Sequence, residues 1–306
     1  MHKRSAMDTG GKKKSNKKRW SFVALAVLMA LLTLFGFAAY RIAMENKSIE
    51  INEYSIKSER LPTAFDGYRI AQVSDLHNAE FGEGNEELLA KLQEANADVI
   101  LLTGDIIDSR KTDVDVALRF TERAAKLAPT YYVKGNHEER VSKEYESLKN
   151  GLISQGVTVL ENQAATIEKD GEYIRLIGVK DPACIGEWSV EEEAYLRTQL
   201  SGFAWGAETE YTVLLSHRPE LFSLYVETGV DLVFSGHAHG GQFRLPKIGG
   251  LFAPDQGFFP KYDGGLYEEA QTKMLVSRGL GNSLFPFRVN NNPEIVVAVL
   301  ESGLQA

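Results

Sequence analysis

Five of the six histidines in this 306-residue sequence follow apolar runs directly, in short polar clusters that also contain acids and an amide. The candidate metal ligands in these clusters are Asp75, His77, Asp105, Asn136, His217, His237 and His239. Each cluster alone is compatible with an ordinary turn. Together they bring imidazoles and carboxylates to one place without matching counter-charges, and charges packed in this way need a cation.

The donor atoms restrict the kind of metal. Nitrogen and oxygen donors suit Mn²⁺, Fe or Zn²⁺, whereas Mg²⁺ and Ca²⁺ favour sites made of oxygen alone. A thiolate cluster is excluded because Cys184 is the single cysteine. Seven candidates are too many for one tetrahedral ion, so the sequence predicts two divalent ions that share a carboxylate, with Mn²⁺ as first choice and Fe or Zn²⁺ as alternatives.

Such a pair of ions, about 3.5 to 4 Å apart, is suited to in-line displacement at phosphorus. Coordination would make hydroxide available near neutral pH, and the ions would neutralise charge on the phosphoryl oxygens. His137 directly follows Asn136, and we expect it to protonate the leaving-group oxygen instead of binding metal. The predicted reaction is hydrolysis of a phosphoester by a metal-bound hydroxide.

Two of the histidines lie one residue apart in the segment SGHAHGGQ, Ser235–Gln242. In an extended segment alternate side chains point the same way, so we expect His237 and His239 to project together, with a modest turn directing each to a different ion. The neighbouring glycines would keep bulk away from the metals and permit backbone angles that a β-carbon forbids.

The clusters lie at the ends of apolar runs that alternate with amphipathic segments. Apolar, β-branched runs predict strands at 68–74, 97–104, 130–135, 172–179, 211–216, 231–236, 273–279 and 294–301. Apolar residues at helical spacing predict helices at 86–96, 114–126, 143–154, 190–200 and 219–228, the first with Asn85 as its N-cap. Loops at the carboxyl ends of strands assemble sites in α/β proteins. The strand count favours a mixed α/β domain with two packed sheets and outer helices.

An uncharged stretch from Trp20 to Tyr40 would make about 31 Å of helix, enough to cross a bilayer. Its terminal aromatic residues and the basic tail at 1–19 predict a single-pass anchor in the cell membrane, with the tail cytoplasmic and the rest outside. The alternatives are a cleaved signal peptide and a buried soluble helix. We expect a polar stalk at 41–63 and a globular domain at 64–306.

Charge is distributed unevenly along the chain. The formal net charge is −8, but the first 19 residues carry a balance of +7, which leaves −15 for the rest. Non-specific nucleic-acid binding needs a basic surface, so an acidic body argues against nucleic acid as a partner. The length and the 43% hydrophobic content support one substantial globular domain or two small ones.

The sequence resembles the calcineurin-like metallophosphoesterases in an ordered set of motifs, namely Asp75-X-His77, Gly104-Asp105-X-X-Asp108, Gly135-Asn136-His137-Glu138, His217 and Gly236-His237-X-His239. The resemblance implies a four-layer α/β/β/α sandwich of two mixed sheets around a dinuclear metal site. It implies that the first ion is held by Asp75, His77, Asp105 and His239. The second is implied to be held by Asn136, His217 and His237, with Asp105 bridging both ions and Asp108 orienting His137.

The segment Gln242–Tyr267 follows the last motif and is rich in glycine, proline and aromatic residues. It is either a packed structural loop or an apolar lip beside the metals, with phosphate-pairing cations nearby. The lip would consist of Phe252, Phe258, Phe259 and Tyr262, and the candidate cations are Arg244, Lys247 and Arg278. The segment and the anchor resemble a bacterial branch of the family with phosphodiesterases and UDP-diacylglucosamine pyrophosphatases, which implies a lipid-linked or other envelope phosphoester as substrate.

Three functions are compatible with these features. A metal-dependent phosphodiesterase or pyrophosphatase is the first hypothesis, and a phosphomonoesterase with the same metals is the nearest alternative. The third is a non-catalytic domain that binds a partner. His137 and Asp108 count against the third, because metal binding alone needs neither residue.

Overall fold

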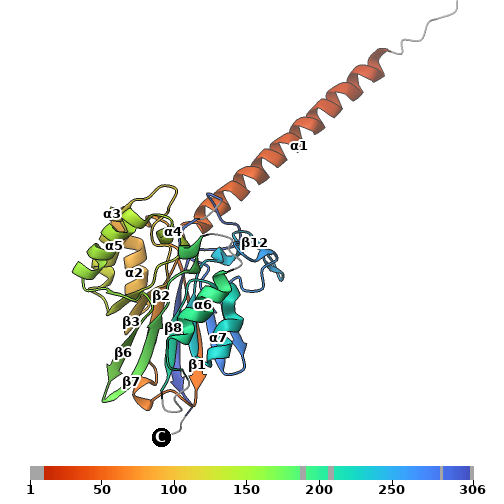
Figure 1. The fold of residues 1–306 in the computed structure, drawn as a ribbon. Coiled ribbons are helices and arrows are strands. Elements are labelled where there is room, and N and C mark those ends of the chain that lie inside the picture. The colour runs from red at the N-terminus through yellow and green to blue at the C-terminus, as the bar shows by residue number, and fades with distance from the viewer. Residues whose placement is uncertain (1–9, 187–190, 206–209, 283–284, 304–306) are drawn as a thin grey trace, which may run out of the picture. The chain divides into compact units, whose positions relative to one another are not determined.

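The computed structural model describes residues 10–186, 191–205, 210–282 and 285–303, and the chain divides into two compact units (Figure 1). The first unit ends at Met44 and contains nearly all of helix α1 (Gly10–Glu45). From Trp20 to Glu45 this helix is long and apolar enough to cross a membrane. The helix thus continues beyond Tyr40, where the uncharged stretch ends.

The second unit, from Glu45 onward, contains two six-stranded sheets. The first sheet has the strand order β1-β16-β2-β3-β4-β5. Strands β2 to β5 are parallel to one another, and β16 is antiparallel to β2 and parallel to β1. The strands are β1 (Glu50–Ser58), β2 (Arg69–Val73), β3 (Val99–Leu102), β4 (Thr130–Tyr132), β5 (Thr158–Val159) and β16 (Glu294–Ser302).

The second sheet has the strand order β14-β15-β9-β8-β7-β6. Its four inner strands are parallel, and the two edge strands are antiparallel to their neighbours. The strands are β6 (Gln163–Lys169), β7 (Glu172–Gly178), β8 (Thr212–Leu215), β9 (Leu232–Ser235), β14 (Gly265–Glu269) and β15 (Thr272–Val276). Both sheets are therefore mixed, as predicted.

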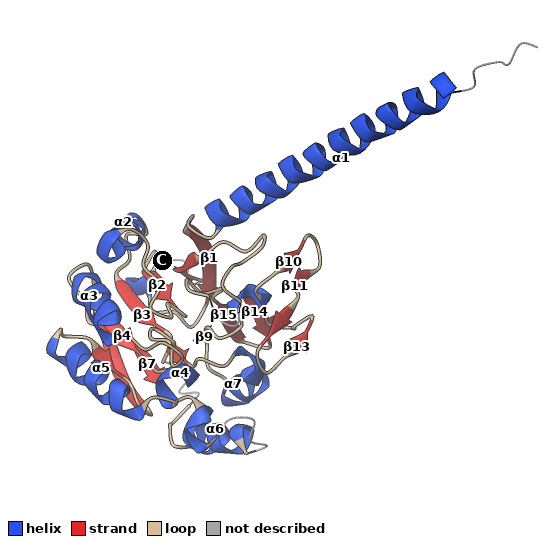
Figure 2. Cartoon of the chain, turned by 90° about the horizontal axis from the view of Figure 1, so that it is seen from above, coloured by secondary structure: helices blue, strands red, loops and turns tan. Residues whose placement is uncertain are grey.

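Buried apolar side chains form three cores. The middle core lies between the sheets, and the other two lie between a sheet and the helices outside it. The first sheet is covered by α2 (Glu86–Glu94), α3 (Val114–Ala124) and α5 (Ser142–Ser154), and the second by α6 (Glu192–Ser201) and α7 (Phe222–Thr228) (Figure 2). The layers are therefore helix, sheet, sheet and helix, which confirms the predicted α/β/β/α sandwich.

Neighbouring residues in the strands contribute to different cores. In β2, Ile70 packs between the sheets, whereas Ala71 packs beneath the helices. Because successive side chains point to opposite faces, a strand buried on both faces is a continuous apolar run. This explains why the run at 97–104, which contains β3, shows no alternation of polar and apolar residues.

Strand β1 corrects the expectation of a polar stalk at 41–63. Glu50–Ser58 pairs residue by residue with Glu294–Ser302, and Ile56 is fully buried between the sheets. Because β1 is an edge strand, most of its polar side chains are partly or fully exposed. Its sequence is therefore mostly polar, which is typical of a stalk as well as of an edge strand. The globular unit therefore begins before residue 64.

Helix boundaries differ from the predictions in three places. Asn85 does not cap α2: its backbone is left-handed, and its Oδ1 accepts a hydrogen bond from the amide of Phe81 instead. The helix predicted from Val190 begins at Glu192 as described, and Val190 itself lies outside the described residues. The helix predicted at 219–228 begins with a 3₁₀ turn before α7.

The glycine-rich segment after His239 folds into two small hairpins. One pairs β10 (Arg244–Leu245) with β11 (Gly249–Gly250), and the other pairs β12 (Phe252–Ala253) with β13 (Gly257–Phe258). Leu245, Ile248, Phe258 and Phe259, which lie in or directly beside these hairpins, are exposed.

Candidate metal centre

The predicted site residues meet where strands of the two sheets end. The loops after β2, β3, β8 and β9 contribute, and the short helix α4 (Asn136–Glu139) follows β4. Buried ligand atoms lie within 4.8 Å of one another in three groups: Asp75, His77 and His239; His77, Asp105 and His137; and Asp105, His217 and His237.

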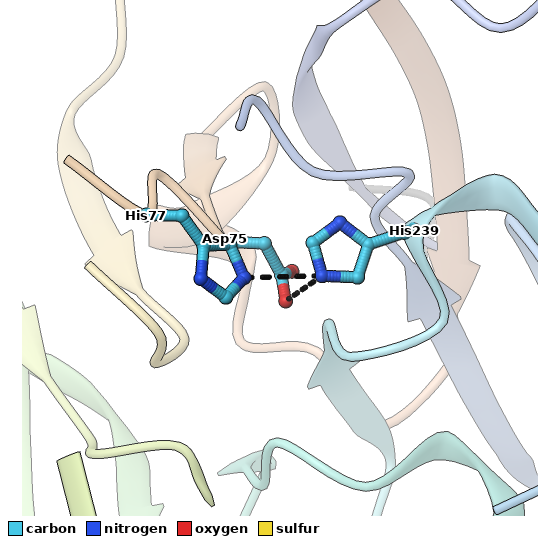
Figure 3. A group of neighbouring side chains, drawn as sticks. All are labelled: Asp75, His77 and His239. Atoms are coloured by element: carbon cyan, nitrogen blue, oxygen red, sulfur yellow. Dashed lines mark hydrogen bonds and ion pairs between the residues drawn. The ribbon is translucent and has the colours of Figure 1, made fainter. Parts of the chain in front are cut away.

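The first group brings two imidazoles against a carboxylate (Figure 3). Nε2 of His77 lies 3.1 Å from Nε2 of His239, which in turn lies 3.4 Å from Oδ1 of Asp75. Nε2 of His77 also lies 3.7 Å from Oδ2 of Asp105. Two N–H groups facing each other at this distance would repel, so at least one of the two nitrogens presents a lone pair to this position.

The second group is organised around His217. Its Nδ1 donates to the carbonyl of Thr103 at 2.7 Å, which turns Nε2 toward Oδ2 of Asp105 at 3.2 Å. The inner atom of the Asn136 amide lies 3.2 Å from the same Oδ2, 3.3 Å from Nε2 of His217 and 2.9 Å from Nδ1 of His237. With its oxygen at this inner position, the amide joins the carboxylate oxygen and the two ring nitrogens as a fourth electron-pair donor. Four such atoms around one point suit a cation.

Asp105 belongs to both halves of the site. Its Oδ2 faces His77 and His217, while its Oδ1 accepts a hydrogen bond from the amide of His137 at 2.8 Å. Glu138 fixes the backbone here, because its carboxylate accepts the amides of Asp105 and Gly135 at 2.8 Å and of Ile107 at 3.1 Å. Asp105, the residue expected to bridge the ions, is therefore fixed by hydrogen bonds at both its side chain and its backbone.

Burial and neighbouring charges set the protonation of these groups. Burial lowers the pKa of His77 to about 3 and, together with His77, lowers the pKa of His239 well below its usual value. Burial would raise the pKa of Asp105, but the imidazoles, chiefly His217, hold it well below the usual range. Burial would lower the pKa of His217, yet the Asp105 carboxylate raises it to about 10. Carboxylates that attract a proton here would equally attract a metal ion.

The backbone at the site is left-handed at residues that are not glycine. Positive φ angles of 47° to 66° occur at Asp75, His77, Asp105, His237 and His239. Such angles are uncommon outside glycine, persist only where surrounding contacts hold them, and cluster at functional sites. They turn each loop sharply, so that two side chains from one short loop reach the centre.

This geometry corrects the expected arrangement of the SGHAHGGQ segment. The segment is a tight turn and not an extended strand, because His237 and His239 both have left-handed backbones. The two imidazoles still reach different groups, His239 beside His77 and His237 beside His217. Gly236 is required because a β-carbon there would collide with Oγ of Ser74 and the Asp75 carboxylate.

His137 lies beside the first group, with its ring 4.5 Å from that of His77. Its Nδ1 accepts hydrogen bonds from the amide of Ser109 at 3.0 Å and contacts the Ser109 hydroxyl at 3.1 Å. Asp108 Oδ1 is 3.5 Å from this nitrogen, and its carboxylate is bound by Arg110 at 2.6 to 3.0 Å. The direct hydrogen bonds at Nδ1 therefore come from Ser109, not from Asp108.

Four residues at the site were not identified from the sequence. Arg218 donates two hydrogen bonds to Asp181, at 2.7 and 2.9 Å, and Asp255 Oδ2 lies 2.8 Å from Nε2 of His237. The buried guanidinium of Arg288 approaches Nδ1 of His239 at 3.4 Å. Arg218 directly follows a motif histidine, which is a weak signal. The other three lie in loops far from the motifs, where no local pattern distinguishes them.

The expected apolar lip is present only in part. Tyr262 is buried, with its ring edge-on to those of Phe222 and Tyr267, so it belongs to the core. Phe258 and Phe259 are 71% and 60% exposed. These two rings, with the half-buried Phe252, are the members of the expected lip that solvent reaches.

Two of the three proposed phosphate-pairing cations are already paired. Arg278 binds the carboxylates of Glu294 and Glu50, at 2.8 Å each. Arg244 lies 3.1 Å from Asp263 and, with Lys247, lines an open pocket of about 550 Å³ beside the first hairpin. None of the metal-centre residues lines this pocket.

The donor set fits a pair of divalent ions. Imidazoles, carboxylates and one amide converge in two adjoining groups, all buried and without sulfur. Buried acceptors without donors are costly unless a cation compensates them. Asp75, His77, Asp105 and His239 would surround one position, and Asp105, Asn136, His217 and His237 the other.

Comparison with known proteins agrees with this geometry. The family model of calcineurin-like phosphoesterases matches residues 68–241. The metallophosphoesterase YkuE of Bacillus subtilis is 31% identical over 88% of this chain and 90% of its own. The phosphodiesterase YaeI of Escherichia coli is 30% identical over 76% of this chain and 82% of its own. A Danio rerio transmembrane protein with a metallophosphoesterase domain is 27% identical over 90% of this chain and 62% of its own.

The family match and the relatives agree on chemistry as well as on fold. Calcineurin-like phosphoesterases use divalent metal ions, and this chain clusters residues that could hold such ions. The chain therefore belongs to the calcineurin-like phosphoesterase family and is a hydrolase of phosphoesters.

Proposed function

We propose that the chain is a phosphodiesterase or pyrophosphatase that works with two divalent ions. The observation that carries this proposal is the sharing of Asp105 between two adjoining groups of buried nitrogen and oxygen ligands. The first ion is assigned to Asp75, His77, Asp105 and His239, and the second to Asp105, Asn136, His217 and His237. Nitrogen and oxygen ligands favour Mn²⁺, with Fe or Zn²⁺ as alternatives.

When bound, the ions supply a nucleophile from water near neutral pH and stabilise negative charge on the phosphoryl oxygens. His137 supplies a proton to the leaving-group oxygen, since it lies beside His77 while its Nδ1 is occupied by Ser109. Asp108 lies near both His137 and His77, at 3.5 and 4.0 Å, and supplies negative charge on that side. The relative named a phosphodiesterase supports diester cleavage over monoester cleavage.

The test compares hydrolysis of a bis(aryl) phosphate and a mono(aryl) phosphate by the purified chain, with Mn²⁺ and with a chelator. We expect Mn²⁺-dependent turnover of the diester to exceed turnover of the monoester, and Asp105→Asn to abolish both. Asp66→Asn is a matched control, because Asp66 is exposed and its carboxylate accepts a hydrogen bond from the backbone amide of Ser302, which is not a residue of the metal centre. Faster monoester turnover would favour a phosphomonoesterase, and no turnover of either would favour a binding domain.

We further propose that the substrate is a lipid-linked or other envelope phosphoester and that α1 anchors the chain in the cell membrane. The basic tail would lie in the cytoplasm and the catalytic unit outside. Support comes from the apolar stretch Trp20–Glu45 and from a relative named a transmembrane protein.

The surface near the metal centre also supports a lipid-linked substrate. Exposed apolar side chains gather on the hairpins and on the neighbouring loop, at Leu245, Ile248, Phe258, Phe259, Phe285 and Phe287. Asn46 is joined to Arg288 of this loop by two hydrogen bonds of 2.8 and 2.9 Å. Because Asn46 follows the apolar helix directly, the apolar surface lies near the point where the globular unit is tethered.

Turnover of a soluble aryl phosphodiester and of a long-chain lipid phosphodiester, presented in the same detergent, tests the substrate class. We expect the lipid phosphodiester to have the higher kcat/KM, since its acyl chains would bury exposed apolar side chains. Equal kcat/KM values for the lipid phosphodiester and the soluble aryl phosphodiester would contradict a lipid-linked substrate.

A further inference from the structure

We propose that Asp255 is a positioning residue for His237 and that it couples the β12–β13 hairpin to the second metal position. Oδ2 of Asp255 lies 2.8 Å from Nε2 of His237, and Nδ1 of the same ring lies 2.9 Å from the inner amide atom of Asn136. The imidazole is therefore held between a carboxylate on its outer side and the metal centre on its inner side. The inference rests on the proposed role of His237 as a ligand.

The two ring nitrogens of histidine are interdependent. When Nε2–H donates to Asp255, the lone pair remains on Nδ1 and points at the centre. Metal-binding histidines commonly donate their other N–H to a carboxylate, which fixes the tautomer and the ring orientation and raises the basicity of the ligand. Loss of such a partner typically weakens metal binding about 10- to 100-fold.

Asp255 is held in place by a buried cation. Arg218, which is 3% exposed, contacts Asp255 through Nη1 and donates two hydrogen bonds to Asp181 from Nε and Nη2. Its Nη1 also lies 3.5 Å from Glu220 and 3.4 Å from Nε2 of His237. The guanidinium thus already places a positive charge among the acids around His237.

This placement of Arg218 argues against a third metal ion. Ligand atoms of Glu220, His237 and Asp255 lie within 4.8 Å of one another, as a metal site would require. However, a divalent ion among them would face the guanidinium at close range, which is electrostatically unfavourable. Asp255 therefore acts on the metal through His237.

The position of Asp255 in the chain gives this contact a second consequence. Asp255 lies in the turn between β12 and β13 with a left-handed backbone, and the strand after the turn contains the exposed Phe258. A hydrogen bond that favours one ring orientation of His237 also favours one placement of the hairpin. Occupancy of the second metal position and order of the hairpin should therefore strengthen each other, since coupling between two sites is reciprocal.

Calorimetric titration of Mn²⁺ into the metal-free full-length chain tests the positioning role. We expect two ions per wild-type chain, and Asp255→Ala should bind one of them about 10- to 100-fold more weakly. Asp255→Asn retains the shape of the side chain and should give a smaller loss of affinity. Asp255→Asn still tests the positioning role if Asp255→Ala does not fold.

Gln256→Ala is the matched control, because Gln256 lies in the same turn but its side chain bonds Tyr262. Its Nε2 donates to the carbonyl of Tyr262 at 2.8 Å, and its Oε1 accepts from the amide of Tyr262 at 2.9 Å. Gln256→Ala removes hydrogen bonds from the turn to Tyr262 but none to His237, so it should lower Mn²⁺ affinity much less than Asp255→Ala does. Equal losses in Gln256→Ala and Asp255→Ala would overturn the inference, and so would unchanged affinity in both Asp255 variants or a third bound ion in the wild type.

Hydrogen exchange of residues 252–259 tests the coupling. Mn²⁺ should slow exchange in the wild type and in Gln256→Ala, and it should have little effect in Asp255→Ala. A Mn²⁺ effect of wild-type size in Asp255→Ala would contradict the coupling. Neither measurement uses a substrate, so failure of the proposed phosphodiesterase activity would leave this result intact. Absence of any Mn²⁺ binding to the wild type would overturn both proposals.

Discussion

The two nitrogens of His137 are not equivalent in this environment. Nδ1 accepts the amide hydrogen of Ser109, so in the neutral ring the proton resides on Nε2. Nε2–H is then the donor available to a leaving group. The backbone at Ser109 selects this tautomer, and the side chain of Asp108, held by Arg110, contributes charge from 3.5 Å away.

Replacing His137 by alanine should reduce kcat about 10²- to 10⁴-fold, because the leaving-group oxygen loses its proton donor. Metal content, measured by elemental analysis, should stay at the wild-type level because none of the proposed ligand atoms is removed. Steady-state kinetics with a bis(aryl) phosphate measures the effect. Near wild-type turnover in a fully metallated variant would exclude His137 as the donor.

Ser109→Ala is the control for His137→Ala. It removes the hydroxyl that lies 3.1 Å from Nδ1 but retains the backbone amide at 3.0 Å. We therefore expect kcat to stay within about threefold of wild type, well below the loss assigned to a general acid. A large loss in Ser109→Ala would mean that the hydroxyl, and not the amide, positions the ring.

β1 is one of the strands whose place could not be read from their composition, together with β5, β6 and β14. Ile56 is fully buried between the sheets opposite Leu300 of β16, while Lys57 next to it is exposed. The strand thus adds both an edge and part of the middle core to the first sheet.

Replacing Ile56 by alanine should lower the free energy of unfolding by about 2 to 5 kcal/mol, the usual result of deleting a large buried aliphatic side chain. Lys57→Ala should change it by no more than about 0.5 kcal/mol. Urea denaturation of both variants under the same conditions measures the difference. A loss below about 0.5 kcal/mol for Ile56→Ala would contradict the assignment of β1 to the core.

The hairpins are the elements that would contact an apolar substrate. Phe258→Asp should lower kcat/KM for a long-chain lipid phosphodiester about 10- to 100-fold, because burial of one such ring contributes about 1.5 to 3 kcal/mol. Turnover of a soluble aryl phosphodiester should stay near wild type. Tyr173→Asp is the control, since Tyr173 is 48% exposed but lies on β7. Equal effects on the two substrates would point to a disturbed metal centre instead.

The metal centre joins the two sheets of the sandwich. The loops that supply it come from β2, β3 and β4 on one side and from β8 and β9 on the other. Ions held between these loops would bind the folded chain and not the unfolded one. Their binding energy therefore adds to the stability of the whole sandwich.

Removal of the ions with a chelator should lower the Tm by about 5 to 10 °C relative to Mn²⁺ at 100 times its Kd, which corresponds to about 2.7 kcal/mol. Added Mn²⁺ should restore the Tm. Differential scanning calorimetry measures the shift, and Asp105→Asn should show little response because the shared carboxylate is lost. A Tm that is the same with chelator and with Mn²⁺ would argue that no ion links the sheets.

The fold class and the residues that cluster at the site could be predicted from the sequence alone. Apolar runs that end in polar clusters mark strands and the loops after them, and five histidines at such positions are too specific a pattern for ordinary turns. These signals are local. A strand buried on both faces is a run of consecutive apolar residues, and the polar residues of the loop follow it directly in the sequence.

The distant residues that complete the site could be identified only in the folded chain. Asp255, Asp181 and Arg288 reach it from loops whose sequences carry no motif, and β1 enters the sheet by pairing with a strand more than 200 residues away. The left-handed turn at His237 and His239 is also a tertiary result, because it is held by contacts with Ser74 and Asp75 around Gly236. Contacts between residues far apart in the chain depend on the packing of the sheets, and no short stretch of sequence encodes that packing.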